Sequence, residues 1–511
     1  MRTRNYTLSI LLLLFFACGS WAEVEDDIEK EPRYNGLPII GAGTYGVVCQ
    51  KDNHVIKISA IDYDDATSRN ILEAAVFRAL DHKSIPKPLF IDIYQGLEKQ
   101  FLEIHLPHYS DIKSKDAASI LKSMASVLDY IHDLNIAHRD IKRSHMLFHQ
   151  GSLVLIDWGN ADVFTGEPSE SCGTTMGYCS PGLLLRDYQH PKEDDMWASG
   201  ISTLEMVHDI ERLFVYHKES ETLNAIFSEK KFDPLYNLAT QWKNNNFSLS
   251  PIILNLVKNA EPASCRDHLL ALLEVCPMSR PTSKQLLARF DRKANQRNQP
   301  MALLEQPIFN KTSSINSQMR RVAYLWLHDI SRELEMPDKV LFEAMSIGDQ
   351  FIKTGALTKN NLQLAASIAL YLAADFYMSG HDIETFVRLA KSAFSEDDFK
   401  ETMVQLLQYA DFNLLFRHTL REYQSEIYRR LESPKAQQIA ILLLTMLEID
   451  EKTFTLSNAE KWALAKNVST RGPTNLAPES KRMLTKLCQK FANEALSQRP
   501  YFSDLYQKPR H

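Results

Sequence analysis

The residue types most able to do chemistry lie in two short stretches. The first reads HRDIK at residues 138–142, and the second reads DWG at residues 157–159. Asp140 and Lys142 are separated by one residue, and Asp157 follows a short apolar run. Carboxylates orient protons or bind divalent cations, and lysines neutralise phosphates. This set of groups suits phosphoryl transfer, which needs positioning and charge neutralisation more than covalent chemistry.

A glycine-rich turn comes earlier in the chain, between two short β-branched runs. It reads GAGTYGVV at residues 41–48, and its small residues allow the backbone to approach phosphates closely. Lys57 follows on the next predicted strand, and Glu73 stands in a predicted helix at residues 66–80. A glycine turn or a strand-edge lysine is common when it occurs alone, so their order along the chain carries the weight.

Taken in order, these segments resemble a eukaryotic-type protein kinase. Three further segments match the family's pattern: the end of an activation segment (172–182), a DxWxxG segment (195–200) and an RPT segment (280–282). The resemblance implies an α+β bilobal protein-kinase fold over residues 36–292. It also implies ATP and Mg²⁺ as cofactors, with Mn²⁺ as an alternative, and a protein as the substrate.

The resemblance assigns roles at the nucleotide site. Lys57 would hold the α- and β-phosphates, with Glu73 orienting it. The residues that would cover the phosphates are Gly41, Gly43, Gly46 and Val48.

Further roles follow for the catalytic loop. Asp140 would accept or orient the proton of the substrate hydroxyl, and Lys142 would lie beside the transferred group and point to serine or threonine acceptors. Asp157 would bind the metal, and Trp158 would pack in the core. Arg139 could bind a phosphate on the activation segment, whose candidate positions are Thr165, Ser169, Ser171, Thr174 and Thr175.

Two residues depart from the family's pattern. His145 stands where an asparagine is expected, and imidazole is a poor ligand for Mg²⁺, so His145 is a weak metal candidate and Asp157, alone or with Asn160, would hold a single ion. Gly182 replaces a glutamate that pairs with the arginine found here as Arg280, so we expect Arg280 to lack its buried partner. Two alternatives stay open: a pseudokinase that acts as a scaffold or nucleotide sensor, and a kinase for a small molecule.

The C-terminal part, residues 319–502, has helical periodicity throughout. Met319-Arg320, Trp326-Leu327, Asp349 and the LQL run at 362–364 resemble a cyclin box, which implies an all-α cyclin-like domain. Cyclins activate kinases by packing on the glutamate helix, so we expect residues 319–400 to pack on the helix that holds Ile71 and Glu73.

The cyclin resemblance also has departures. Asp375 stands where cyclins have a kinase-contacting lysine, and Tyr377 and Met378 replace downstream glutamates. The usual docking contact is therefore altered.

Length and composition bound the remaining expectations. The chain of 511 residues is too long for one ordinary core, and polar residues 293–318 form a predicted linker. Its net charge of -6 argues against nucleic acid as a partner. Residues 1–22 have the layout of a signal peptide and are too short to span a bilayer comfortably. They predict the secretory pathway; the alternative is the cytoplasm or nucleus, including those of a host cell.

Overall fold

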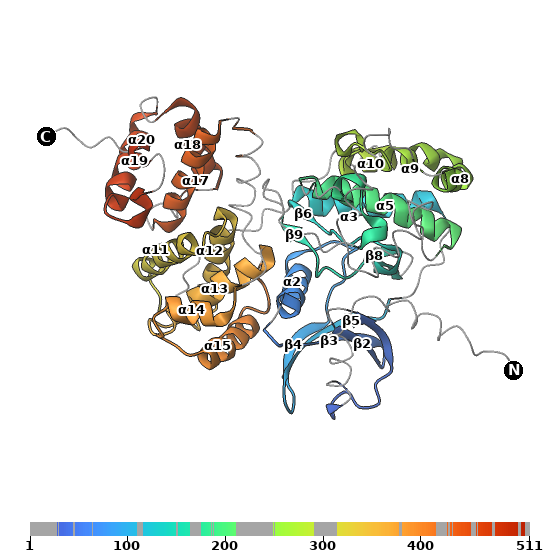
Figure 1. Cartoon of the computed structure of the whole chain (residues 1–511), viewed down its shortest axis with the longest axis horizontal. Coiled ribbons are helices and arrows are strands. Elements are labelled where there is room, and N and C mark those ends of the chain that lie inside the picture. Colours follow the sequence, from blue (N-terminus) through green and yellow to red (C-terminus); the bar gives the residue numbers. More distant parts are fainter. Residues whose placement is uncertain are drawn as a thin grey trace. The chain divides into compact units, whose positions relative to one another are not determined.

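The computed structural model describes most of residues 28–505, with its longest gaps at 110–115, 164–174, 211–248, 291–313 and 415–426. Two compact units make up the chain (Figure 1): residues 1–162 and 169–300 form the first, and residues 301–511 form nearly all of the second. The predicted signal peptide, Met378 and the candidate phosphorylation positions from Thr165 to Thr174 lie outside the described residues.

The first unit begins with a five-stranded antiparallel sheet in the order β1-β2-β3-β5-β4. Helix α2 (Asp65–Ala79) follows the third strand, as the helical spacing predicted. The strands are β1 (Ile39–Gly43), β2 (Gly46–Lys51), β3 (His54–Ala60), β4 (Phe90–Gln95) and β5 (Gln100–Pro107). The predicted hairpin around the glycine turn is confirmed, since β1 and β2 pair with Gly43 opposite Gly46.

Alternation along the strands separates the core of the sheet from the nucleotide site. Val47, Ile56 and Ile58 are buried in a cluster with Tyr34 and Phe101. Successive side chains of a strand point to opposite faces, so Lys57 points away from its buried neighbours, with Ile104 opposite it on β5. The burial of those neighbours therefore fixes the direction in which the lysine points.

The rest of the first unit is mainly helical. Helix α3 begins at a cap in which Asp116 accepts a hydrogen bond from the backbone N–H of Ala118, and α5 begins with a proline, which tolerates the first turn. The helices are α3 (Ala117–Asp133), α4 (Pro181–Leu184), α5 (Pro191–His208), α8 (Pro251–Asn259), α9 (Arg266–Leu272) and α10 (Ser283–Phe290). Short 3₁₀ turns span Arg143–His145, Met176–Tyr178, Ala263–Cys265 and Pro277–Ser279.

Two small strand pairs hold the loops between the helices. One joins β6 (Ile136–Ala137) to β9 (Asp162–Val163), and the other joins β7 (Met146–His149) to β8 (Ser152–Leu155). At the open end of the second pair, the backbone N–H of Ile156 donates to the carbonyl of His145 over 2.9 Å. This hairpin brings the end of the 138–145 loop beside Asp157.

The second unit is helical in all of its described regular elements, as the periodicity predicted. They are α11 (Ser317–Glu333), α12 (Asp338–Lys353), α13 (Leu362–Tyr377), α14 (Ile383–Leu389), α15 (Glu396–Tyr409), α17 (Pro434–Ile449), α18 (Asn458–Arg471), α19 (Pro478–Phe491), α20 (Phe502–Leu505) and the 3₁₀ turn Ala495–Gln498. Almost every residue of α13 is buried, so it is the central helix of this unit. Ser314, within the predicted linker, donates its hydroxyl proton to the carbonyl of Leu357 over 2.6 Å.

A buried ion pair joins the first two helices of the second unit. The guanidinium of Arg320 contacts both carboxylate oxygens of Asp349, over 2.6 and 2.8 Å, and a third nitrogen donates to the carbonyl of Glu448 over 2.7 Å. Tyr324 donates to the same carboxylate over 2.7 Å. Gly348 permits this approach, because a Cβ there would lie 2.8 Å from the Tyr324 hydroxyl oxygen. Two residues of the predicted cyclin box thus build the core of the unit.

None of the described helices is both long enough and apolar enough to cross a lipid bilayer.

Candidate active site

The predicted nucleotide-site pair is formed in the first unit. The ammonium of Lys57 on β3 makes a short ion pair with Glu73 on α2 and lies 3.6 Å from Oδ1 of Asp157. The other Glu73 oxygen accepts from the backbone N–H of Trp158 over 3.2 Å. The predicted pairing of Lys57 with Glu73 is therefore formed, and the 157–159 loop joins it.

Glycine is required sterically at Gly46 in the predicted phosphate-covering loop. Its φ is +143°, and a Cβ there would lie 2.4 Å from the carbonyl oxygen of Ile58. At Gly41 a Cβ would meet only the Val48 side chain, at an ordinary 3.7 Å. Gly43 ends β1 opposite Gly46. The close approach of β2 to β3 thus explains one glycine of the motif.

The catalytic loop is anchored by Asp195 at the start of the DxWxxG segment on α5. Its two carboxylate oxygens accept from the backbone N–H groups of His138 and Arg139, each over 2.8 Å. His132 lies 3.1 Å from the same carboxylate. The motif placed Asp195 in the sequence, but its role as anchor follows from a long-range contact that spacing does not reveal.

Thr175 completes a compact cluster with the predicted catalytic residues. Lys142 donates to Oδ2 of Asp140 over 2.9 Å and to the Thr175 hydroxyl over 3.0 Å. The hydroxyl and backbone N–H of Thr175 donate to Oδ1 of Asp140 over 2.7 and 3.0 Å. The sequence offered Thr175 only as a phosphorylation candidate, so its contact with the catalytic carboxylate is new.

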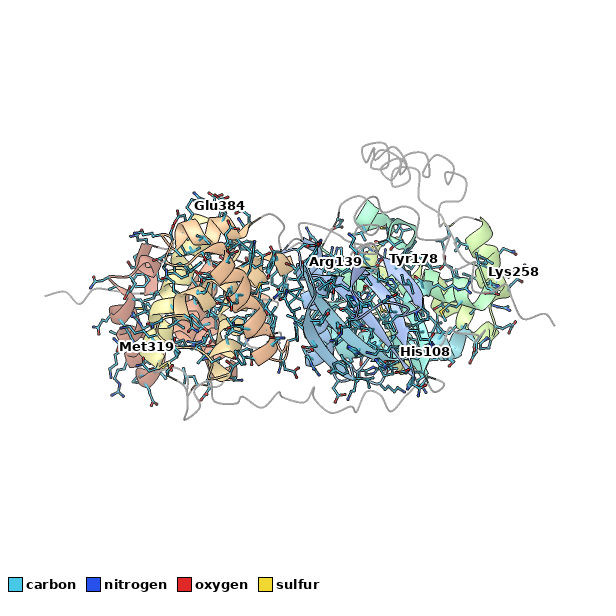
Figure 2. The ribbon with its side chains drawn as sticks, turned by 90° about the horizontal axis from the view of Figure 1, so that it is seen from below. His108, Arg139, Tyr178, Lys258, Met319 and Glu384 are labelled. Atoms are coloured by element: carbon cyan, nitrogen blue, oxygen red, sulfur yellow. The ribbon has the colours of Figure 1, made fainter. Side chains whose placement is uncertain are left out.

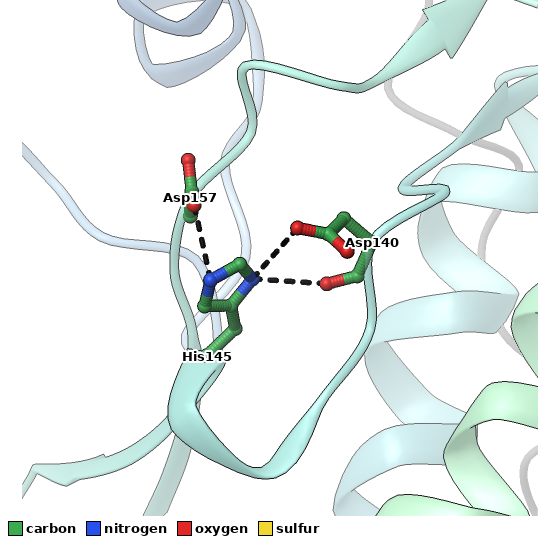
Figure 3. Close-up of side chains that lie close together, drawn as sticks. All are labelled: Asp140, His145 and Asp157. Carbon is green, nitrogen blue, oxygen red and sulfur yellow. Dashed lines mark hydrogen bonds and ion pairs between the residues drawn. The ribbon is translucent and has the colours of Figure 1, made fainter. Parts of the chain in front are cut away.

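His145 bridges the two carboxylates of the site (Figure 3). Its Nδ1 lies 2.9 Å from the carbonyl oxygen of Asp140 and 3.6 Å from the carboxylate of that residue. Its Nε2 lies 3.0 Å from Oδ2 of Asp157. Both ring nitrogens therefore face oxygen atoms. Asp140, His145 and Asp157 together form a group that could hold a metal ion.

Electrostatics keep the carboxylates of Asp140 and Asp157 ionised. Burial raises the pKa of Asp140, but His145 and then Lys142 outweigh it and hold that pKa below its usual value. The same opposition, with His145 and Lys57 as the lowering charges, places the pKa of Asp157 well below its usual value. Lys57 has a raised pKa, because the carboxylates of Glu73 and Asp157 outweigh its burial. The carboxylates of Asp140 and Asp157 are therefore charged at neutral pH.

The residues at Asp157 fit an oxygen-bound cation. Its Oδ1 is buried and receives no hydrogen bond from the described residues; the Lys57 ammonium faces it at 3.6 Å, so the atom can still accept a bound cation. The second cation position of protein kinases is less well matched, since His145 offers a nitrogen where the family has an amide oxygen. Asn160, the alternative oxygen donor, is buried further along the same loop.

One expectation from the sequence is wrong. Arg280 was expected to lack a partner because Gly182 replaces the usual glutamate, yet its buried guanidinium donates to the carbonyls of Glu193, Glu274 and Val275 over 2.8–3.1 Å. A weaker contact of 3.4 Å reaches Asp194. Backbone carbonyls take over the hydrogen bonds that the glutamate would accept, and spacing along the sequence cannot show them.

Two other predicted residues have structural partners. Arg139, labelled in Figure 2, pairs with Asp162 over 2.9 Å, so the proposed phosphate-binding arginine already contacts a carboxylate. Trp158 is fully buried, as expected, and donates from its indole nitrogen to the carbonyl of Leu155 over 2.9 Å.

The fold and this arrangement of side chains define a protein kinase domain. Comparison with family models agrees: the model described as "Protein kinase domain" matches residues 34–290, and the model "Cyclin, N-terminal domain" matches residues 292–415. The chain belongs to the protein kinase family, and a cyclin N-terminal domain follows its kinase domain.

Curated relatives include two fungal proteins. The calcium/calmodulin-dependent protein kinase cmkA of Emericella nidulans is 26% identical over 284 residues, which cover 51% of this chain and 63% of that protein. A calcium/calmodulin-dependent protein kinase of Metarhizium anisopliae is 25% identical over 285 residues, which cover 51% of this chain and 68% of that protein. The chain thus spans less than two thirds of the first relative's length.

Proposed function

We propose that this chain is an ATP-dependent protein kinase that transfers the γ-phosphoryl group to serine or threonine hydroxyls of proteins. One observation carries this proposal: both groups of side chains that phosphoryl transfer requires are formed. Lys57, Glu73 and Asp157 form the nucleotide-facing one, and Asp140 and Lys142 form the other, together with Thr175.

The contacts indicate what each residue does. Asp140 is held by Thr175 and Lys142 and has a lowered pKa, so it acts mainly by orienting the substrate hydroxyl rather than as a strong base. Lys142 places a positive charge beside that hydroxyl. Lys57, oriented by Glu73, would hold the α- and β-phosphates of ATP.

A divalent cation would be held by Asp157. When bound, such a cation supplies charge neutralisation for the phosphates. The contribution of the chain is to keep Asp157 ionised, and the positive charges of His145 and Lys57 do this against the effect of burial.

The decisive experiment is phosphate transfer from γ-labelled ATP by the full chain, with Mg²⁺ and then Mn²⁺ and a panel of protein acceptors. We expect incorporation into serine or threonine that is abolished by Asp140→Asn and by Asp157→Ala. Asp133→Asn, an exposed aspartate at the end of α3, is the matched control and should keep full activity. Incorporation that survives both catalytic substitutions would contradict the proposal.

The second candidate is a pseudokinase that binds nucleotide without turnover. The observation that favours it is His145, because its ring occupies the place of a metal-binding amide and contacts the carboxylates of both Asp140 and Asp157. Binding of a fluorescent ATP analogue with Kd unchanged by Asp140→Asn, together with no transfer under either metal, would support this reading.

We also propose that the cyclin-like domain regulates the kinase domain of the same chain. The support is the order of the two domains and the position of Glu73 on α2, the helix that cyclins act upon in kinases that they activate. A covalent link raises the effective concentration of the two domains, so even a weak contact could form.

A protease site inserted within residues 293–300 tests this regulation in the full chain. If the domains act in cis, cleavage followed by dilution should lower activity, while the uncleaved chain keeps its activity at every dilution. Equal activity of the cleaved and uncleaved chains at all dilutions would rule out regulation in cis.

The residues that match a signal peptide support a further proposal, that the protein enters a secretory pathway. Expression in secreting cells should then give a mature chain that begins after Ala22, and replacement of Leu12 by arginine in the apolar run should prevent processing. A chain that keeps Met1 in the cytosol would contradict it.

A further inference from the structure

His145 lies where protein kinases bind their second cation, and its ring is held in a defined orientation. The ring is buried, with 7% of the residue exposed. Its Nδ1 lies 2.9 Å from the backbone carbonyl of Asp140, so the proton of this nitrogen is committed to that oxygen. The other nitrogen, Nε2, is aimed at the carboxylate of Asp157 (Figure 3).

This orientation is the one that metal-binding histidines adopt. Such a histidine donates its second ring N–H to a carbonyl or carboxylate, which fixes the tautomer and presents the other nitrogen to the metal. The backbone carbonyl of Asp140 performs that task for His145. The supporting contact is therefore already in place.

The spacing of the donor atoms also suits a shared cation. Nε2 of His145 and Oδ2 of Asp157 lie 3.0 Å apart. Two neighbouring ligands of an octahedral ion with bonds of about 2.1 Å are separated by about 3.0 Å. The two donor atoms are therefore already as far apart as one shared ion requires.

We propose that the second cation position of this kinase is a mixed nitrogen–oxygen site, formed by His145 and Asp157, that selects a first-row transition-metal cation such as Mn²⁺ over Mg²⁺. The inference rests on the proposed function, since the nucleotide supplies the remaining oxygen ligands. Mg²⁺ requires oxygen ligands, whereas imidazole nitrogen favours transition-metal cations. The presence of His145 in place of asparagine thus changes which metal ion binds at the second cation position but does not remove that position.

Electron paramagnetic resonance of Mn²⁺ provides a test that does not depend on catalysis. The full chain is loaded with Mn²⁺ and a methylene-bridged ATP analogue, which carries no nitrogen among its phosphates, and ¹⁴N hyperfine coupling is measured. We expect a directly bound ¹⁴N in the unaltered chain, its loss in His145→Asn, and its retention in His149→Asn. His149 is the matched control because it lies on β7, next to the site in sequence, and its ring contacts Tyr109.

Competition between the two metals gives a second readout. The ratio of Mn²⁺ to Mg²⁺ affinity should fall by roughly tenfold or more in His145→Asn, since changes around metal ligands alter affinity by about that factor. The unaltered chain should bind two Mn²⁺ ions for each nucleotide.

The outcomes separate this inference from the proposed function. Mn²⁺ binding without ¹⁴N coupling, or with an unchanged metal preference in His145→Asn, would overturn the inference and leave the kinase proposal standing. If Mn²⁺ shows ¹⁴N coupling in a chain that transfers no phosphate, the inference about the metal site stands and the kinase proposal is overturned. If a single Mn²⁺ ion binds without nitrogen, His145 replaces the second cation and the inference is wrong.

Discussion

The catalytic cluster and the buried cluster of the cyclin-like unit neutralise charge in different ways. In the buried cluster around Arg320, the two carboxylates pair with cations: Asp349 with Arg320, and Glu448 with Lys461 over 3.1 Å. In the catalytic cluster, Lys57 and Lys142 face three carboxylates, which are those of Glu73, Asp140 and Asp157.

His145 lies between two of these carboxylates, those of Asp140 and Asp157. An imidazole can give its nitrogen to a metal, but a guanidinium cannot. The buried charges of the helical unit hold its helices together. In the kinase domain three carboxylates face two lysines, which leaves a negative charge that a ligand can neutralise. Substitutions in the two clusters should therefore have opposite consequences for stability and for turnover.

The largest expected effect on stability is at Arg320. Arg320→Met leaves the carboxylate of Asp349 buried without its main partner, and loss of one member of such a pair costs about 3–5 kcal/mol. Hydrogen exchange of α11 and α12, measured by mass spectrometry on the full chain, reports this loss without assuming that both units unfold together.

Two variants control for the Arg320 result. Arg321→Met removes a more exposed pair with Glu494, which should cost less than about 1 kcal/mol. Arg320→Met combined with Asp349→Leu should recover much of the loss, because no charge is then left unpaired. Equal protection in Arg320→Met and the unaltered chain would show that the pair does not stabilise this unit.

The catalytic cluster should give the opposite result at Asp140. Asp140→Asn keeps the shape of the side chain but removes the charge that orients the substrate hydroxyl, so turnover should fall by about 10²–10⁴-fold. Hydrogen exchange of the first unit should change little compared with the loss at Arg320. If Asp140→Asn unfolds the first unit, or retains full turnover, the contrast between the two clusters is wrong.

The sequence predicted the contacts that the family resemblance assigns, and missed those that it does not assign. Lys57 with Glu73, and Asp140 beside Lys142, follow from spacing combined with the family resemblance. Asp195 reaches Arg139 across 56 positions and Arg280 reaches Glu193 across 87, so no local pattern reveals these contacts.

The same limit applies to the fold. Hairpins and amphipathic helices leave a periodic signal, and the predicted strands and helices at the nucleotide site were found where expected. The partners of Arg280 are mostly backbone carbonyls, which carry no residue identity. The missing glutamate alone therefore led to the wrong expectation for Arg280, because backbone carbonyls accept its hydrogen bonds.

Asp194 provides a smaller test, in which the substitution should stabilise the fold, whereas Arg320→Met should destabilise it. Burial, opposed by the hydrogen bond from Ser180 and by Arg280, raises the pKa of Asp194 to about 6. A raised pKa means that the folded chain holds the proton more tightly than the unfolded chain. The stability associated with that proton is complete below pH ~4 and is lost as the pH rises through about 6.

Asp194→Asn should therefore stabilise the first unit at pH 7 by about 1–3 kcal/mol, and the gain should vanish below pH ~4. The measurement is the unfolding midpoint of the kinase domain in urea from pH 4 to 8, with Glu193→Gln as the neighbouring control. Destabilisation at pH 7 would mean that Arg280 gains more from this carboxylate than their separation of 3.4 Å indicates.

The smallest effect is expected when the missing glutamate is restored. A Cβ at Gly182 would meet nothing closer than Pro277 Cγ and Ser180 Oγ, both at 3.8 Å, so the position accepts a side chain. Gly182→Glu should stabilise the segment around α4 by only about 1 kcal/mol, because Arg280 already donates to three carbonyls.

Slower hydrogen exchange of residues 177–184 would report this gain, and Gly182→Gln separates charge from the added side chain. If glutamine protects the segment as well as glutamate, the gain comes from the lost glycine and not from Arg280. A gain for glutamate alone, reduced by salt, would show that Arg280 still accepts the partner that this chain lacks, in contrast to Arg320, whose carboxylate partner is present.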